Sequence, residues 1–464
     1  MPVNSFSDYP MTWKPDRQAL KRPIYLSLAS QLERDIRQGL LPPGTKLPPQ
    51  RELADFLDIN FTTVTRAYKI CELKGLLHAR TGSGTFVAPQ AAQTVTISLA
   101  GMQQECIDLG LVASYEETNA LTLPILRQVA RSQRLESLLT YAWPDGMPAH
   151  KQAGVYWLQH LGLHTDPDHL ALVSGTQNGL VICLSALFSP GDRIAVDRYT
   201  YANLIELAKL YHLQLIPVDG DAQGMSAASL AAHCQLHPMQ GIYLMPSCGN
   251  PTTIRISAAR REELAEVIRR YRLILLEDDI HAFLTADILP DYQGPMVNLV
   301  PEQGIYICGT SKSICSGLRV AYLTGGETFR DPLRKALFNI NVKTSALDVE
   351  VITQLIRSGQ IWKIIARKFS LAQAANDCFN AIFPQAVQGH PLSFFRWLPI
   401  ASRQQGIGVE QQLLARGVRV YHSDRFLCGN AGPQKYLRIS LATTANLAEL
   451  KKGLGILADY IASE

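Results

Sequence analysis

The spacing of apolar residues changes along this chain, and in the first part it has the period of short helices. Over residues 24–39 an apolar residue recurs at every fourth position, which predicts an amphipathic helix that stops at a glycine. Pro48 and Pro49 predict the start of a second, short helix, because proline is tolerated in a first helical turn. We expect three apolar side chains of this short helix to face inward: Leu53, Phe56 and Leu57.

A third helix is predicted to start at Asn60, whose side chain is a favoured helix cap. Residues 76–87 then predict a β-hairpin, because Gly82 and Gly84 permit a tight turn. Helix, short helix, helix and hairpin in this order predict a winged helix-turn-helix unit over residues 20–87. The third helix has an apolar face of Val64, Ala67, Tyr68 and Cys71, opposite a polar face of Thr62, Thr65, Arg66 and Lys69.

From residue 170 onward, short uninterrupted apolar runs alternate with amphipathic helices. Such runs are expected for strands that are buried on both faces of a mainly parallel sheet. The alternation therefore predicts an α/β fold, with a mainly parallel sheet flanked by helices, for the larger part of the chain. The clearest runs are residues 170–174, 193–196, 241–245, 273–276 and 304–308.

Length and composition indicate a folded protein of more than one domain. A length of 464 residues indicates two or three domains, and 47 % hydrophobic with 18 % charged residues indicates a globular protein. Residues 88–105 start with small and polar residues without periodicity, which predicts a linker. Because no apolar stretch resembles a signal peptide or could span a bilayer, we expect a cytoplasmic protein without membrane contact. The nine cysteines form no C-x-x-C pair, so no metal site is expected.

The net charge of +4 lies entirely in residues 1–87, which hold 12 Lys or Arg and 8 Asp or Glu. The remaining 377 residues hold 32 of each kind. A basic unit joined to a neutral body indicates a polyanionic partner, although a chance imbalance of four charges gives the same count. The polar face of the third helix suits the major groove of DNA, although a merely solvated face has the same composition. The side chains that suit phosphates are Arg51, Arg66, Lys69 and Arg80.

Three ordered motifs resemble the DNA-binding domain of the GntR family: LPPQRELA at 47–54, TTVTRAY at 62–68 and GSGTFV at 82–87. Two positions depart from the family, because Phe61 stands where arginine is usual and Gln50 where serine is common. We therefore expect operator affinity or sequence to differ from the family norm. The resemblance implies that this unit binds double-stranded operator DNA through Arg51, Thr62, Thr63, Thr65, Arg66, Lys69, Arg80 and Gly82.

Polar clusters follow several of the predicted strands. The turn at 174–179 opens a helix, whose N-terminus suits a phosphate. Three carboxylates at 277–279 end a buried run, where they are costly unless paired with a cation, and no further ligands for a metal are evident. Lys312 follows another run, where its surroundings can lower its pKa, and Arg319 can grip a phosphate with two N–H groups. Taken singly, each has an ordinary explanation as a structural turn or surface residue.

In this order the clusters resemble the fold type I aminotransferases over residues 106–464. The resemblance implies a large lobe at about 150–335 and a small α/β lobe from about 345 to 464 that includes the N-terminal segment. It implies pyridoxal 5′-phosphate as cofactor, with Lys312 as its Schiff-base lysine and Arg438 as the arginine that binds a substrate α-carboxylate. The remaining cofactor contacts that it implies are Gly175, Thr176, Gln177, Ser311 and Arg319 for the phosphate, Tyr201 for the ring face, Asn250 for the phenolic oxygen and Asp278 for the pyridine nitrogen.

Four positions depart from that family. Where a tyrosine usually donates to the phenolic oxygen, Ile280 and His281 stand, and our hypothesis is that His281 replaces this donor. Thr253 replaces a common glycine, Lys151 a usual arginine and Tyr199 a proline. These changes bear on substrate choice and turnover, while cofactor binding remains supported.

A GntR-like head joined to an aminotransferase-like body resembles the MocR subfamily of bacterial transcription regulators. The resemblance implies a homodimeric regulator that senses an amino acid, an amine or a vitamin B6-related ligand through pyridoxal phosphate. Two alternatives stay open: a working aminotransferase with a vestigial head, and a DNA-binding scaffold that has lost its cofactor. Intact Lys312, Asp278 and Arg319 argue against the scaffold, and the charge division favours the regulator.

Overall fold

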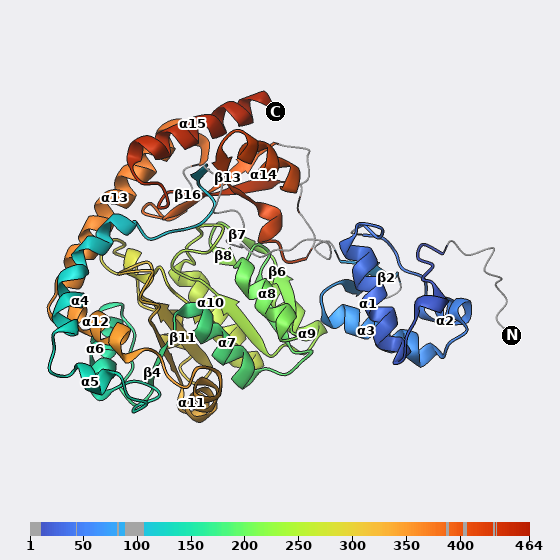
Figure 1. Ribbon diagram of the computed structural model, residues 1–464, viewed down its shortest axis with the longest axis horizontal. Helices are drawn as coiled ribbons and strands as arrows, with labels where there is room; N and C mark the ends of the chain where they lie inside the picture. Colours follow the sequence, from blue (N-terminus) through green and yellow to red (C-terminus); the bar gives the residue numbers. More distant parts are fainter. Residues whose placement is uncertain are drawn as a thin grey trace.

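The computed structural model describes residues 11–42, 44–80, 83–88, 106–386, 389–401, 406–429, 432 and 434–464. Figure 1 shows a small N-terminal unit, hereafter the head, beside a much larger unit, the body. The predicted linker at 88–105 lies outside the described residues except for Ala88.

The head contains the predicted order of elements: α1 (Ile24–Arg37), α2 (Gln50–Leu57), α3 (Phe61–Leu73), β1 (Leu77–Arg80) and β2 (Gly84–Val87). Asn60 caps α3 by accepting a hydrogen bond from the backbone N–H of Thr62, and the predicted apolar face of α3 is buried. One prediction was wrong, because Phe56 is 37 % exposed. Ala54 belongs to the buried face of α2 instead. Ala54 and Phe56 lie on opposite edges of the face centred on Leu53 and Leu57, at equal angles from its centre, so helical spacing alone does not choose between them.

The body is built around a seven-stranded sheet. Its strands are β4 (Leu170–Val173), β5 (Arg193–Asp197), β6 (Gln214–Val218), β9 (Gly241–Leu244), β10 (Ile274–Asp278), β11 (Gly304–Gly309) and β12 (Ala321–Gly325). Their order is β4-β12-β11-β10-β9-β5-β6, and every neighbouring pair is parallel except the two that involve β12. The predicted mainly parallel sheet is therefore confirmed, and all five predicted runs are strands.

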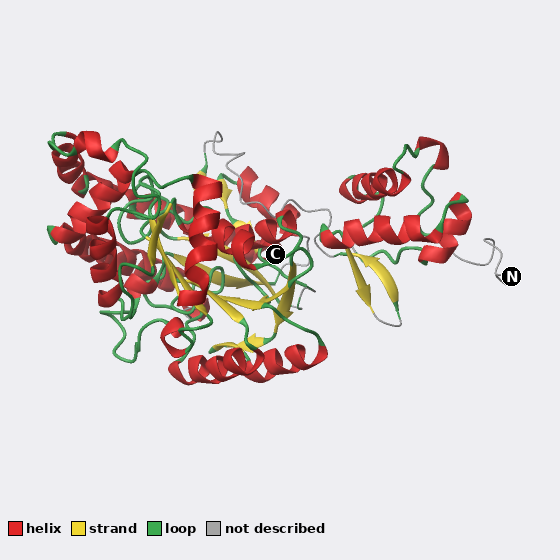
Figure 2. Ribbon diagram, turned by 90° about the horizontal axis from the view of Figure 1, so that it is seen from below, coloured by secondary structure: helices red, strands yellow, loops and turns green. Residues whose placement is uncertain are grey.

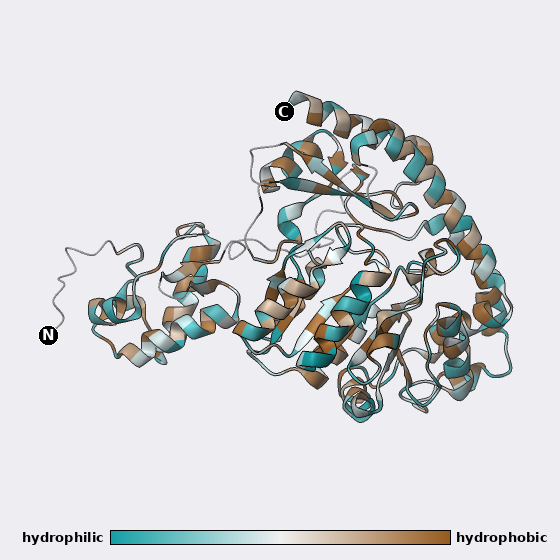
Figure 3. Cartoon of the chain, turned by 180° about the vertical axis from the view of Figure 1, so that it is seen from behind, coloured by the Kyte–Doolittle hydropathy of each residue, from teal (hydrophilic) through white to brown (hydrophobic). Residues whose placement is uncertain are grey.

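Helices cover both faces of this sheet (Figure 2). Alternate residues of β4 belong to two different apolar clusters, with Leu170 and Leu172 in one and Ala171 and Val173 in the other. Figure 3 shows apolar positions concentrated in the strands, while the helices carry both apolar and polar segments. The helices α7 (Thr176–Leu187) and α11 (Glu327–Asn341) contribute to one cluster, and α10 (Ala258–Tyr271), α12 (Ala346–Arg357) and α13 (Gln360–Ile382) to the other.

A smaller sheet lies toward the C-terminus, in the order β13 (Phe395–Ile400), β16 (Lys435–Ser440) and β15 (Tyr421–His422). Beside it, β14 (Val418–Arg419) pairs with β3 (Ile107–Asp108), so the start of the body joins its end. The helices α14 (Gly406–Ala415) and α15 (Leu447–Ser463) accompany these strands (Figure 1). The lobe boundaries near 335 and 345 stay predictions. Among the described residues, no helix is long and apolar enough to cross a membrane.

Candidate functional site

The turn between β4 and α7 is shaped to admit an arginine. Gly175 has a φ of +86°, and a Cβ atom there would lie 2.4 Å from Arg319 Nη2, so only glycine leaves room for this guanidinium. Arg319 Nη1 in turn donates to Ser311 Oγ at 3.0 Å. Thr176, the first residue of α7, has a buried Oγ1 without a hydrogen-bond partner among the described residues. A cation, hydroxyls and a helix N-terminus thus meet at one point, which is the chemistry that holds a phosphate.

Gln177 lies one residue further along α7 and points elsewhere. Its Oε1 accepts from Asn203 Nδ2 at 3.0 Å and from the Tyr201 hydroxyl at 3.4 Å. Tyr201 caps α8 (Ala202–Leu210), and burial, with the charge of Asp278 as a further cause, raises the pKa of its hydroxyl to about 12. The Gln177 side chain therefore contacts Tyr201 and Asn203, and a role for Gln177 at the phosphate stays a prediction.

The three consecutive carboxylates at the end of β10 separate by the alternation of the strand. Glu277 accepts from the backbone N–H groups of Met296 and Val297, and Asp279 accepts from Ser247 Oγ at 2.8 Å. Asp278 points to the other face, where its Oδ2 accepts from the Tyr243 hydroxyl at 2.8 Å.

The second oxygen of Asp278, Oδ1, is buried and has no partner among the described residues. Burial raises the pKa of this carboxyl to about 7. A buried acceptor without a donor is costly, so this oxygen fits an N–H group brought by a ligand.

Lys312 follows β11 and is partly buried. Its Nζ donates to the backbone carbonyls of Val112 and Ala113, the latter at 3.2 Å. Burial, followed by the charges of Arg438 and Arg319, lowers the pKa of this amine to about 7. A large fraction of the amine is therefore neutral near pH 7, as a nucleophilic lysine requires.

Arg438 lies in β16 with its side chain buried against aromatic rings, Phe426 being nearest at 4.6 Å. Its Nη1 donates to Asn250 Oδ1 at 2.9 Å and its Nη2 to the carbonyl of Gly110 at 2.8 Å. Burial lowers the pKa of this guanidinium to about 10. The two predicted residues Asn250 and Arg438, which lie 188 positions apart, are thus in direct contact.

His281 is buried beside the rings of Phe394 and Phe395, and neither ring nitrogen has a partner among the described residues. Burial and then the charge of Lys312 lower the pKa of this imidazole to about 3. A neutral histidine near Lys312 has one N–H left to donate, which is what its predicted role requires. That role stays a prediction.

The other departures have contacts of their own. Lys151 pairs with Asp145 at 2.6 Å, and Tyr199 packs on Trp397 with ring centroids 5.3 Å apart. Thr253 keeps the positive φ, +61°, that a glycine would favour. No group of three or more His, Cys, Asp or Glu within the described ranges is placed to hold a metal.

Sequence reasoning missed several contributors to this site. Tyr243 and Asn203 hold Asp278 and Tyr201, and Lys368 donates to the carbonyl of Lys312. Tyr243 lies in a buried strand whose apolar pattern conceals its hydroxyl, and Lys368 lies on a helix 56 residues after its partner. Neither carries a local motif that would reveal it.

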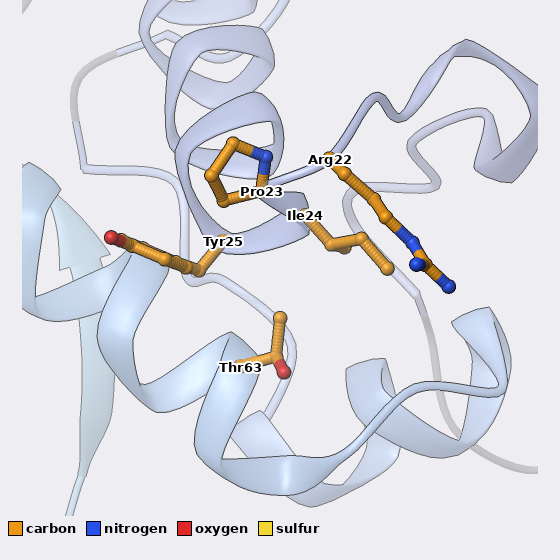
Figure 4. A pocket seen from close by; sticks show the side chains of 5 residues that line it. All are labelled: Arg22, Pro23, Ile24, Tyr25 and Thr63. Carbon is orange, nitrogen blue, oxygen red and sulfur yellow. The ribbon is translucent and has the colours of Figure 1, made fainter.

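The head presents the predicted polar face of α3. Thr62, Arg66 and Lys69 are exposed, while the Thr65 hydroxyl donates to Gln50 Oε1 at 2.8 Å and so joins α3 to α2. Thr63 is half-buried at the edge of the open hollow drawn in Figure 4. The Arg80 side chain and Gly82 lie outside what the structure describes.

Two aromatic rings beside this face stack with arginine guanidinium groups. The guanidinium of Arg51 lies 5.7 Å from the centroid of Phe61, which is 42 % exposed at the first position of α3. The guanidinium of Arg66 lies at the same distance from the ring of Tyr25. Tyr25 lines the hollow of about 520 Å³ (Figure 4). Phe61 thus occupies the position where recognition helices contact base edges.

The fold and both sites define a regulator class with two parts. Residues 24–87 match the gntR family of bacterial regulatory proteins, and residues 105–454 match the class I and II aminotransferases. The chain belongs to the GntR-type transcription regulators of the MocR subfamily, which join these two parts.

Its relatives bear this out. The chain is 37 % identical, over 98 % of each chain, to the HTH-type transcriptional regulator YdeF of Bacillus subtilis. It is 24 % identical to the probable rhizopine catabolism regulatory protein MocR of Rhizobium meliloti, over 87 % of this chain and 83 % of that one. The kynurenine aminotransferase of Pyrococcus horikoshii, solved with PMP, superposes with a TM-score of 0.70 at 18 % identity, covering 78 % of this chain and 92 % of that one.

Proposed function

We propose that this regulator binds pyridoxal 5′-phosphate in the body and uses it to sense an amino acid, an amine or a vitamin B6-related ligand. The observation that carries the proposal is the Oδ1 atom of Asp278, a buried carboxylate oxygen without a donor among the described residues. The same fold holds Lys312, an amine of lowered pKa. A protonated pyridine ring supplies the missing N–H, and the cofactor's phosphate suits Arg319 and Ser311.

Each residue has a distinct task in this proposal. Asp278 would hold the ring nitrogen protonated, Lys312 would supply the amine for the cofactor's aldehyde, and Tyr201 would contact the ring. When bound, the cofactor supplies an electron sink and an aldehyde that reacts with amines. The N-terminus of α7 and the Thr176 hydroxyl complete the phosphate contacts, and Asn250 and His281 serve the phenolic oxygen.

Arg438 is the proposed contact for a ligand carboxylate. Its guanidinium is buried among aromatic rings, so an incoming carboxylate exchanges water for a charge-assisted pair in a poorly hydrated site. Its two hydrogen-bond partners among the described residues, Asn250 and the carbonyl of Gly110, are neutral, so neither competes with a carboxylate for the guanidinium charge. The ligand is therefore proposed to carry both an amine and a carboxylate, with simple amines binding more weakly.

The DNA contacts are proposed to run through the exposed face of α3. Arg66→Ala should weaken binding to the DNA upstream of this gene and lower the salt dependence of binding by about one ion per head, because one phosphate contact is lost. Fluorescence anisotropy over a series of salt concentrations measures both. Lys452→Ala, the same charge change on an exposed residue of α15, should leave the slope unchanged. An unchanged slope for Arg66→Ala contradicts this contact.

A homodimer is proposed for the body. Exposed large apolar side chains gather in residues 121–156, and Lys343 joins this stretch to the end of α11 by donating to the carbonyls of Thr140 and Ala142. Patches of this kind mark protein interfaces. Its members are Leu121, Leu123, Leu126, Leu139, Tyr141, Trp143, Tyr156, Phe338, Ile340 and Val342.

Leu126→Asp should convert the dimer to monomers, because it buries an unpaired carboxylate in the interface. We expect association to weaken by about 100-fold or more, from a cost of about 3 kcal/mol, as measured by sedimentation velocity over a range of concentrations. Leu236→Asp at the end of α9 (Ala227–Leu236), an exposed leucine outside the patch, is the control. Dimers of unchanged affinity in the Leu126 variant assign the interface elsewhere.

The whole proposal is tested with purified protein, pyridoxal phosphate and candidate amino acids. We expect a visible absorbance band when the cofactor is added, a shift of that band with the ligand, and a parallel change in affinity for the upstream DNA. A band that forms and shifts without any change in DNA affinity would argue against sensing. Sustained transfer of the amino group to a 2-oxo acid, at about 1 per second or faster, would favour the alternative of a working aminotransferase.

A further inference from the structure

Six consecutive backbone carbonyls at the start of the body accept hydrogen bonds from residues of the candidate site and of the small sheet with its flank. We call residues 109–114 the strap. Its first carbonyls face the small sheet and its flank: Leu109 accepts from the N–H of Ser440 at 2.7 Å, Gly110 from Arg438, and Leu111 from Thr443. Its last carbonyls face the large sheet: Val112 and Ala113 accept from Lys312, and Ser114 from Lys368 at 2.7 Å.

Lys368 is the fixed point of this arrangement. Its side chain is fully buried on α13, and its Nζ donates to three oxygens: the carbonyl and hydroxyl of Ser114, and the carbonyl of Lys312 at 2.9 Å. Burial and the charge of Lys312 lower its pKa to about 7. In its ammonium form Lys368 uses all three N–H donors, and these contacts join the strap to the Lys312 loop.

Lys312 is the variable point. As a free ammonium it has three N–H donors and supplies both Val112 and Ala113. When its neutral amine condenses with an aldehyde, the nitrogen forms a double bond to the aldehyde carbon, and two hydrogens leave with the aldehyde oxygen as water. The nitrogen then carries at most one proton, so at least one of the two strap contacts is lost.

Arg438 adds a second variable point. It donates to the strap at Gly110, and it is the proposed partner of a ligand carboxylate. Lys312, which would engage the cofactor, and Arg438, which would engage the ligand, are therefore two of the side chains that hold the strap. Lys368 engages no ligand and holds Ser114 in either state.

We propose that the strap is the sensing element of this protein and is released from Lys312 when that lysine reacts. Lys368 is the positioning residue: it holds the strap at Ser114 while the contacts to Lys312 are lost. This rests on the proposed function, in which Lys312 reacts with pyridoxal phosphate. In the sequence, the strap follows the predicted linker 88–105 by only a few residues, so a change in the strap acts at the body end of the link to the head. Coupling of this kind is typically worth a 5- to 150-fold change in DNA affinity.

Hydrogen–deuterium exchange on the full chain tests the strap directly. Pyridoxal phosphate should speed exchange of peptides that cover 109–116 by about fivefold, as expected when an anchoring contact worth about 1 kcal/mol is lost. Pyridoxine 5′-phosphate, which carries an alcohol in place of the aldehyde, should occupy the same site without this effect. Equal changes with both compounds, or no change with either, overturn the proposal.

Lys368→Met tests the positioning role. The variant should still give the absorbance band with pyridoxal phosphate, but strap exchange should be fast with or without it, and the cofactor should no longer alter affinity for the upstream DNA. Lys363→Met, at an exposed lysine of the same helix, should behave as the wild type. Lys368→Arg, which retains donors, should restore part of the response. A Lys368→Met variant with a full DNA response contradicts the role.

Two further measurements keep these outcomes interpretable. If Lys368→Met fails to fold by circular dichroism, Ser114→Ala removes only the 3.1 Å hydroxyl contact and should halve the response or more. If wild-type protein gives no absorbance band at all, the proposed function has failed. A band without any change in strap exchange contradicts the strap proposal alone.

Discussion

Lys312→Ala should abolish the visible absorbance of protein-bound pyridoxal phosphate and every response of DNA affinity to amino acids. The variant removes the amine and leaves the phosphate contacts of Arg319 and Ser311, so the cofactor should still bind, but without a covalent link. DNA affinity without cofactor should stay within about threefold of the wild-type value, a difference of about 0.7 kcal/mol.

The pH dependence of attachment provides a sharper test in the wild type. Only the neutral amine attacks an aldehyde, and a pKa of about 7 leaves about half of Lys312 neutral at pH 7, against less than about 0.1 % for an ordinary lysine. The rate of attachment should therefore rise between about pH 6 and 8 and level off above. Stopped-flow absorbance measures this rate. A rate that continues to rise through pH 9 would show that the Lys312 amine titrates as an exposed one.

Arg319→Ala serves as the matched control for both measurements. It removes a phosphate contact but keeps the amine, so cofactor affinity should fall by about tenfold, the loss expected for a hydrogen bond to a charged group. The covalent band should still form at saturating cofactor. Loss of the band in both variants would mean that the Lys312 result reflects binding alone.

The contrast between Asp278 and its neighbours shows what sequence could and could not predict. The three carboxylates at 277–279 indicated a cation partner, but the choice of Asp278 came from family resemblance. Only the structure separates them physically, because the partners of Glu277 and Asp279 come from distant loops. Strand alternation alone places Asp278 opposite the other two, and does not say which face holds the pocket.

Long-range contacts limited prediction more than local pattern did. The α3 faces and the five apolar runs follow from periodicity, since the pattern of residues close in sequence determines them. The antiparallel strand β12 and the strap have no such signal, because Lys312 and its acceptor Val112 are 200 residues apart. The error at Phe56 arose at the edge of a helical face, where spacing is least decisive.

Asp278→Asn should have opposite effects on cofactor affinity and on the stability of the cofactor-free protein. Affinity for pyridoxal phosphate should fall by about 10- to 100-fold, because a hydrogen bond between two charged groups, worth about 1.5–3 kcal/mol, is lost. Tyr243→Phe removes the neutral contact to Oδ2 and leaves Oδ1 in place, so it should cost less. An affinity loss in Tyr243→Phe equal to that in Asp278→Asn would remove Oδ1 from the site.

The stability effect follows from the raised pKa of Asp278, about 7 when folded. Between about pH 4 and 7 the folded state keeps a proton that the unfolded state has released, so this group makes stability fall as pH rises through that window. Asparagine is neutral throughout and resembles the protonated acid. The cofactor-free variant should therefore match the wild type near pH 4 and exceed it in free energy of unfolding by about 2 kcal/mol at pH 8, by the scale of about 1.4 kcal/mol per pKa unit with a discount for relaxation. Urea unfolding at the two pH values measures the difference. A carboxylate that costs stability until a ligand arrives is the mark of a residue kept for binding, whereas equal stability at pH 8 would mean that Asp278 is already paired within the chain.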